Sequence, residues 1–289
     1  MGTKRSWEGQ PLGLHPKSDA TMSAHDSTGP SVQSIFETFR DELDEHHDRR
    51  ERIIKTSRDI TALSKKVIFA LQRVRTLNQP PPNKIAQENQ TRFDQIRALF
   101  ESLVPELTEI KAWRYQRQIS PGIQEFIEAL AFDHYLRTQT LISHAEVTAW
   151  LPGEILVSEE DYLMGLFDLT GEMMRFAVMA LSSGNASATT QSTSTAGPEA
   201  SDASSTSVPV LAPAQAGIVV DLRTMRARFE SLSVPRRHNM LRDLSKKLEV
   251  MQTSVEKVER AAYGILVRGS ERPSGWTPDL SVSMEVETH

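Results

Sequence analysis

The chain has 289 residues, of which 38% are hydrophobic, so it is long enough to bury a sizeable core in one or two domains. It contains no cysteine, which excludes disulfides, thiolate zinc sites and a cysteine nucleophile. Its formal net charge of −5 argues against a stand-alone nucleic-acid-binding protein, although its 33 Lys and Arg residues can still gather on one surface.

The first 30 residues are rich in Gly, Pro, Ser and His without periodicity, which is typical of a disordered tail, and we expect a second tail over residues 273–289. The polar start is unlike a signal peptide, and no apolar run reaches the roughly 18 residues of a membrane span. The sequence therefore predicts a soluble, intracellular protein that does not act in a membrane.

A long N-terminal helix is predicted from Ser31 to Gln79, because this stretch lacks Pro and Gly and its apolar residues recur at helical spacing. Three prolines from Pro80 onward end it. The apolar stripe of this helix is longer than the core of one compact domain requires, which indicates that part of it lies in an interface.

Further helices are predicted as far as residue 184. They run from about Gln87 to Gln118 with an interruption at Pro105, from Pro121 to about Leu141, from a capping box at Ser143 and Glu146 toward Trp150, and from Ser158 and Asp161 to near Gly184. Each start or stop is marked by a residue that caps or breaks a helix.

Residues 182–217 are mainly Ser, Thr, Ala, Pro and Gly, and this composition predicts a flexible insertion that cannot join a core. Two more helices are predicted after it, over residues 218–232 and 235–267. No segment has the pattern of a strand, so we expect an all-α protein with one helical domain formed by residues 31–181 and 218–272.

Two pairs of carboxylates lie inside apolar stretches of these helices. Glu125 and Glu128 are three residues apart, and Asp168 and Glu172 are four apart, so each pair projects from one face of its helix. Four buried carboxylates facing one another repel unless they are protonated or bridged by a cation. The pattern predicts a divalent metal site, with core ion pairs involving Arg175 as the alternative.

The type of metal follows from the ligands. Oxygen ligands favour a hard cation such as Mg²⁺ or Mn²⁺. A di-iron bundle would require a Glu-x-x-His motif, and here Glu125 is followed at that spacing by Glu128 and not by His. This absence counts against a di-metal oxidoreductase.

The sequence resembles the translin family, and within it the translin-associated factor X branch. The resemblance covers about residues 33–272 apart from the insertion, and these are some of the segments that carry it: His47-Asp48-Arg49-Arg50-Glu51-Arg52, Gly122-Ile123-Gln124-Glu125-Phe126-Ile127-Glu128-Ala129, Asp168-Leu169-Thr170-Gly171-Glu172-Met173-Met174-Arg175 and Val267-Arg268-Gly269-Ser270-Glu271. Both acid pairs occur at the spacing of this branch, whereas translin itself is not acidic there.

The resemblance implies a seven-helix bundle, a hetero-oligomer with translin, and Mg²⁺-dependent endoribonuclease activity. In such proteins the acid-bearing subunit is catalytic, and the family's metal and catalytic positions map onto Glu125, Glu128, Asp168 and Glu172. The implied substrates are single-stranded or short RNA, such as passenger strands of small interfering duplexes and precursor-tRNA fragments, with DNA as a further ligand. We expect the protein in the cytoplasm and the nucleus.

Contacts to RNA are predicted at two places. Arg114 and Arg117 alternate with aromatic residues directly before the first acid pair, a combination that binds phosphates and stacks on bases. Lys65 and Lys66 form a second basic pair on the long helix. For both places the alternative is a helix surface that simply faces water.

Three classes of function are in view on the sequence, and the missing Glu-x-x-His motif counts against the di-metal oxidoreductase among them. Two others remain. The first is the metal-dependent ribonuclease subunit. The second is a non-catalytic helical partner that stabilises translin, with the acids as structural ion pairs. Metal-dependent cleavage of RNA by a reconstituted complex distinguishes them.

Overall fold

The computed structural model describes residues 31–183, 213–233 and 243–268. In these ranges it contains eight α-helices, one 3₁₀ helix and no strand, so the predicted all-α class is confirmed. The helix α3 has five residues and is separated from α4 only by Tyr115. Counted as one interrupted helix, this pair gives the predicted number of seven.

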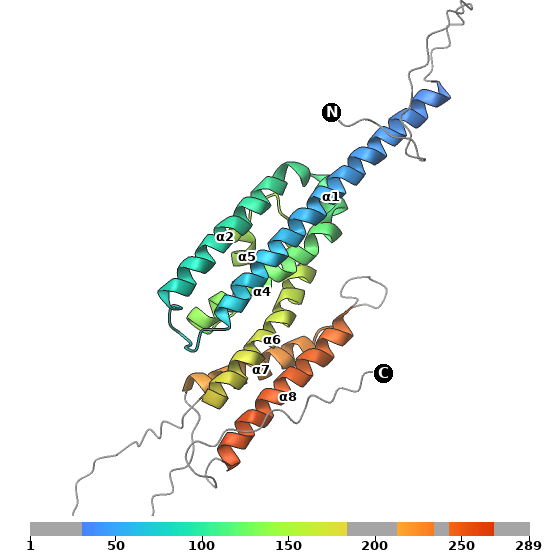
Figure 1. The fold of residues 1–289 in the computed structure, drawn as a ribbon. Coiled ribbons are helices and arrows are strands. Elements are labelled where there is room, and N and C mark those ends of the chain that lie inside the picture. Colours follow the sequence, from blue (N-terminus) through green and yellow to red (C-terminus); the bar gives the residue numbers. More distant parts are fainter. Residues whose placement is uncertain (1–30, 184–212, 234–242, 269–289) are drawn as a thin grey trace, which may run out of the picture. The chain divides into compact units, whose positions relative to one another are not determined.

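The helices follow one another along the chain, as Figure 1 shows. They are α1 Val32–Leu71, α2 Asn83–Leu103, the 3₁₀ helix η1 Val104–Glu106, α3 Ile110–Arg114, α4 Gln116–Thr138, α5 His144–Trp150, α6 Glu159–Ser183, α7 Pro213–Glu230 and α8 Leu244–Arg268. The chain divides into two compact units, residues 1–46 and residues 47–289, and all the packing described below lies within the second unit.

The predicted helix boundaries hold best where the sequence has a cap. Ser143 and Glu146 form both halves of the capping box at the start of α5, and the Ser158 hydroxyl accepts a hydrogen bond from the Asp161 amide at the start of α6. Pro105 interrupts the second predicted helix as expected, but it does so as a separate 3₁₀ turn.

Several predicted boundaries were wrong, and α2 begins at Asn83, four residues before the predicted start. The first helix ends at Leu71 and not at Gln79, because the chain turns there and Asn78 takes a positive φ, with its amide bonded to the Leu136 carbonyl. The acid-bearing α4 begins at Gln116 and carries Pro121 inside it. The helix α7 begins at Pro213, five residues earlier than predicted.

Several predicted segments lie outside the described residues: both tails, residues 184–212 of the insertion, and the start of the last predicted helix over residues 235–242. The domain boundaries that depend on them stay predictions. Within the described residues, no helix is long and apolar enough to cross a membrane.

The core of the second unit is aromatic around α4. The ring of Phe126 packs edge-on against Phe93 and Phe100 of α2 and lies against Trp150 of α5. The guanidinium of Arg97 lies 4.4 Å from the centre of the Trp150 ring, which closes this cluster with a cation–π contact. These contacts fix α4 between α2 and α5 and so orient the opposite face of α4.

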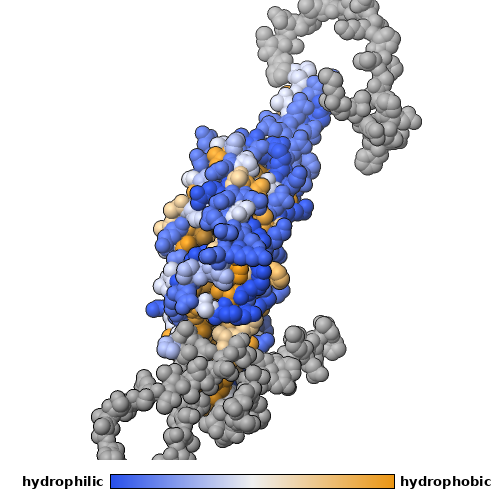
Figure 2. Space-filling model, turned by 60° about the vertical axis from the view of Figure 1, so that its left-hand side comes forward, coloured by the Kyte–Doolittle hydropathy of each residue, from blue (hydrophilic) through white to orange (hydrophobic). Residues whose placement is uncertain are grey.

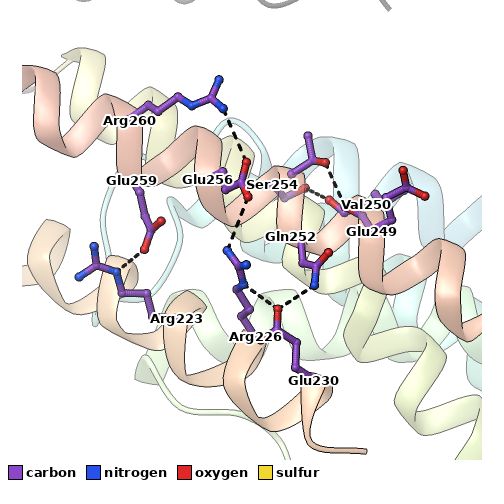
Figure 3. A network of polar contacts seen from close by, with 11 residues as sticks. Arg223, Arg226, Glu230, Glu249, Val250, Gln252, Ser254, Glu256, Glu259 and Arg260 are labelled. Atoms are coloured by element: carbon purple, nitrogen blue, oxygen red, sulfur yellow. Dashed lines mark hydrogen bonds and ion pairs between the residues drawn. The ribbon is translucent and has the colours of Figure 1, made fainter.

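A polar network joins α7 to α8 (Figure 3). Arg226 and Gln252 both donate to one oxygen of Glu230 at 2.8 Å, and Arg223 pairs with Glu259. Because these contacts are exposed, each contributes little by itself, but together they set the register of α8 on α7. The helix α8 also packs on α6.

Candidate functional site

Glu125 and Glu128 lie on the side of α4 that faces α6 and the C-terminal half of α1. Their neighbours Phe126, Ile127 and Ala129 are fully buried, so the two carboxylates occupy the border of the core. The side chain of Glu125 is 20% exposed. Because apolar residues recur at helical spacing along α4, these acids lie where they are partly shielded from solvent, as the sequence predicted.

The second acid pair approaches the first because α6 packs closely on α4 at Gly165. A Cβ atom at this position would lie 2.6 Å from a methyl carbon of Ile127 and 3.0 Å from the carbonyl oxygen of Gln124. Asp168 follows Gly165 by three residues, on the same face of α6. The lack of a side chain at Gly165 thus lets the two acidic helices come together.

The four carboxylates interact electrostatically. Burial raises the pKa of Glu128 to about 8, and the charges of Asp168, Glu125 and Glu172 add to the rise. Burial also raises the pKa of Glu125, while the charge of Lys65 opposes the increase. The predicted mutual repulsion of the two acid pairs is therefore present in the structure.

Cationic groups lie against three of the four acids. Lys65 Nζ is 3.8 Å from Glu125 Oε2, Lys247 is ion-paired with Asp168, and Arg175 is 3.7 Å from Glu172 Oε1. These pairs agree with the ion-pair alternative for Glu172 and Arg175. Within the described ranges, Glu128 has no ion-pair partner.

The donor chemistry fits a hard divalent cation, because all four groups are carboxylates and the partly buried Glu128 has no ion-pair partner among the described residues. Among the residues that the structure describes, however, no three His, Asp or Glu side chains gather closely enough to hold a metal ion. Three of the carboxylates instead lie against lysine or arginine neighbours. Binding of a cation by this set therefore requires side-chain rotation and release of these neighbours.

Two residues beside the acids were not predicted. Gln72, just past the end of α1, donates to Glu172 Oε2 at 2.8 Å, and Lys247 reaches Asp168 from the first turn of α8. No local signal in the sequence marks either residue, because each meets its acid across 79 or more positions of the chain. Both residues reach the acids of α6 only through the tertiary packing of α1 and α8.

The predicted RNA-binding residues are divided between separate places. Lys65 belongs to the acid site through its contact with Glu125, whereas Lys66 lines a groove between α1 and α2 together with Asp59 and Gln95. Arg114 and Arg117 are exposed at the end of α3 and the start of α4, beside the 70% exposed Trp113. The structure thus links Lys65 to the acids and places the other three basic residues on other surfaces.

A buried hub holds the junction of α3 and α4. Asp161, which is 1% exposed, accepts hydrogen bonds from Ser158, Ser120, Gln116 and Gln124. Gln116 therefore points toward α6 and not toward solvent. The hub fixes the first two turns of α4, which lead directly to Glu125.

The chain is similar to known proteins over most of its length. The model of the translin family matches residues 48–269. Translin-associated protein X of Rattus norvegicus is 28% identical over 285 residues, covering 90% of this chain and 87% of the relative. The homologue of that protein from Schizosaccharomyces pombe is 29% identical, covering 83% of this chain and 91% of the relative. Translin of Mus musculus is 26% identical over 54% of this chain and 71% of the relative.

Two solved structures have the same fold. The crystal structures of apo-NeC3PO and AfC3PO superpose with TM-scores of 0.55 and 0.54, each at 18% identity and covering 81% of this chain and 97% of theirs. The match of the family model over residues 48–269 includes both acidic helices. The chain belongs to the translin family.

Proposed function

We propose that this chain is the acid-bearing subunit of a metal-dependent endoribonuclease that assembles with translin. The observation that carries the proposal is Glu128, a partly buried carboxyl group that has no ion-pair partner in the described residues and has three further carboxylates as electrostatic neighbours. A purely structural core has no use for such a group, because an unpaired buried acid lowers stability. Functional sites are where this kind of arrangement is common.

The partner and the substrate class come from the family. Relatives are named for their association with translin, and translin itself is a more distant relative of this chain. The substrates we propose are single-stranded or short RNA, whose phosphates match Lys65 beside the acids and the exposed Arg114 and Arg117 on a separate surface.

Glu125, Glu128, Asp168 and Glu172 would hold the cation, Mg²⁺ or Mn²⁺. When bound, such an ion supplies a Lewis acid and an activated water for attack on a phosphodiester. Residues of the chain itself also determine the charge of this site. Glu128 can hold a proton near neutral pH, and Lys65 and Lys247 neutralise the charges of Glu125 and Asp168. A bound cation would neutralise these carboxylates instead, which would leave the two lysines free to pair with RNA phosphates.

A second candidate function is a non-catalytic partner of translin. It is favoured by the three cations that already lie against Glu125, Asp168 and Glu172. In that case the acids are structural ion pairs, and removing their charge should destabilise the fold.

The experiment is to co-purify the chain with the translin of the same organism and to incubate the complex with a labelled single-stranded RNA of about 20 nucleotides. We expect cleavage that stops in EDTA and returns on addition of excess Mg²⁺ or Mn²⁺. Translin prepared alone is the control for contaminating nuclease. Cleavage that is insensitive to EDTA, or no cleavage by a complex that binds the RNA, would favour the non-catalytic function.

A further inference from the structure

Phe69 is exposed within an otherwise buried run of α1. In Val67-Ile68-Phe69-Ala70-Leu71 the other four side chains are at most 6% exposed, whereas Phe69 is 69% exposed. The helix therefore turns this one aromatic ring away from the core that its neighbours fill. An exposed phenylalanine loses the stabilisation that burial would give it. Single exposed apolar side chains are common on soluble proteins, so it is the surroundings of the ring that indicate a ligand.

The ring lies on the side of α1 that touches the acid site. Lys65 precedes Phe69 by four residues and contacts Glu125, and Gln72 follows it by three and donates to Glu172. Residues at this spacing share one face of a helix. Phe69 is thus placed between Lys65, which reaches the first acid pair, and Gln72 just past the end of α1, which reaches the second.

The surroundings of Phe69 are charged. Lys65, Lys66 and Arg73 are exposed on the adjoining turns, and the acids lie on the facing helices. Such a setting is unlike the centre of a protein–protein interface, from which charged residues are depleted. An aromatic ring among lysines and arginines is instead the combination that stacks on a base while the cations meet the phosphates.

We propose that Phe69 is a stacking platform for one nucleobase of single-stranded RNA, which it holds next to the four carboxylates. The inference rests on the proposed function in that RNA must reach this site. Because every base has a π-face, the platform is tolerant of sequence and selects unpaired over paired nucleotides. A base inside a rigid duplex cannot present its face to the ring.

The test uses the complex of the full chain with translin and a short RNA containing one 2-aminopurine, in EDTA so that no cleavage occurs. Stacking on Phe69 quenches the fluorescence of this base. Phe69→Ala should remove most of the quenching and weaken RNA binding by about 10-fold, the effect of one lost base–aromatic contact. Phe69→Trp should restore both.

The matched control is Tyr263→Ala on α8, an aromatic residue that is 61% exposed and carries no predicted role. It should leave the quenching and the affinity unchanged. Unchanged quenching and affinity in Phe69→Ala would overturn the proposal. So would a Phe69→Ala complex that no longer assembles in size-exclusion chromatography, because the ring would then be covered by protein.

These readouts separate this proposal from the proposed function. Binding is measured without divalent ions, so a wild-type complex that never cleaves RNA but shows quenching dependent on Phe69 supports the platform and refutes the nuclease. A complex that cleaves normally with Phe69→Ala at unchanged affinity supports the nuclease and refutes the platform.

Discussion

Glu106 ties η1 to α1 through two arginines. Its carboxylate lies 2.8 Å from Arg52 Nε and 3.1 Å from an Arg49 nitrogen, and the Arg49 side chain is only 10% exposed. The hydrogen bond from Arg52, together with the charges of both arginines, lowers the pKa of Glu106 against the opposing effect of burial. A partly buried ion pair of this kind makes stability depend on pH.

Because the pKa of Glu106 is lower in the folded protein, its contribution to stability is present above the ordinary value of 4.5 and is lost as pH falls through the folded value. We therefore expect Glu106→Gln to lower the melting temperature at pH 7 by roughly 2–4 °C, a difference that shrinks as pH falls below 4.5. Thermal denaturation followed by circular dichroism measures this. The control is Glu101→Gln, which changes an exposed acid on the preceding helix and should show no such pH dependence. If the melting temperature of Glu106→Gln fell further below that of the wild type as the pH is lowered, the ion pair would not have the role described.

The four acids of the site could be predicted from the sequence, but the residues that neutralise them could not. Carboxylates inside an apolar helical stripe are conspicuous, which is why Glu125, Glu128, Asp168 and Glu172 could be singled out. Lys247 and Gln72 are ordinary polar residues in their local sequence. Their roles arise only from contacts between distant helices, and these contacts cannot be inferred from spacing.

The spacing between α4 and α6 depends on one glycine. Gly165 faces Ile127 and the Gln124 carbonyl, whereas a Cβ at Gly171, six residues later on α6, would meet nothing within 4 Å. The two positions therefore allow the same substitution to be compared in a tight and in an open environment of one helix.

We expect Gly165→Ala to destabilise the chain by about 1–3 kcal/mol through overpacking. Gly171→Ala should instead raise stability by roughly 0.5–1 kcal/mol, because alanine restricts the unfolded chain and favours a helix. Denaturant unfolding of both variants gives the comparison. Equal effects at the two positions would show that α4 and α6 are not in the close contact described here.

The elements themselves were predictable to the extent that caps and breakers mark them. The capping box fixed the start of α5 and Ser158 the start of α6, whereas the end of α1 depends on Asn78 and its bond to α4, a tertiary contact. The sequence predicts a helix start at Pro121, because proline favours the first position of a helix. The helix α4 instead begins five residues earlier, where Gln116 bonds to the Asp161 hub.

On the face that Figure 2 shows, the surface of the described residues is mainly hydrophilic, with hydrophobic residues in scattered areas. One ordered exception lies in the first unit, where α1 presents an exposed apolar stripe. It consists of Val32, Ile35, Phe36, Phe39 and Leu43, at 38–72% exposure and at the spacing of one helix face. A stripe of this kind on a long helix indicates an interface.

We expect Phe36→Ser combined with Phe39→Ser to weaken association with translin by at least about 10-fold, because exposed aromatics of this kind act as interface anchors. The same double variant, expressed alone, should aggregate less than the wild-type chain. Co-purification and light scattering measure the two effects. Glu37→Ser combined with Asp41→Ser, on the other side of the same helix, is the control, and an unchanged assembly in the phenylalanine variant would exclude the stripe from the interface.

The proposed function requires that the four carboxylates form the catalytic centre of an RNA-cleaving complex. The most direct measurement compares the rate of RNA cleavage by translin complexes carrying the wild-type chain and Glu128→Gln, each with its RNA affinity and melting temperature determined in parallel. Since Glu128 has a raised pKa and no ion-pair partner among the described residues, the neutral substitution should leave folding, assembly and RNA binding intact. We predict that cleavage falls by roughly 100-fold or more. A Glu128→Gln complex that cleaves at the wild-type rate, or one that fails to fold or assemble, would contradict the account.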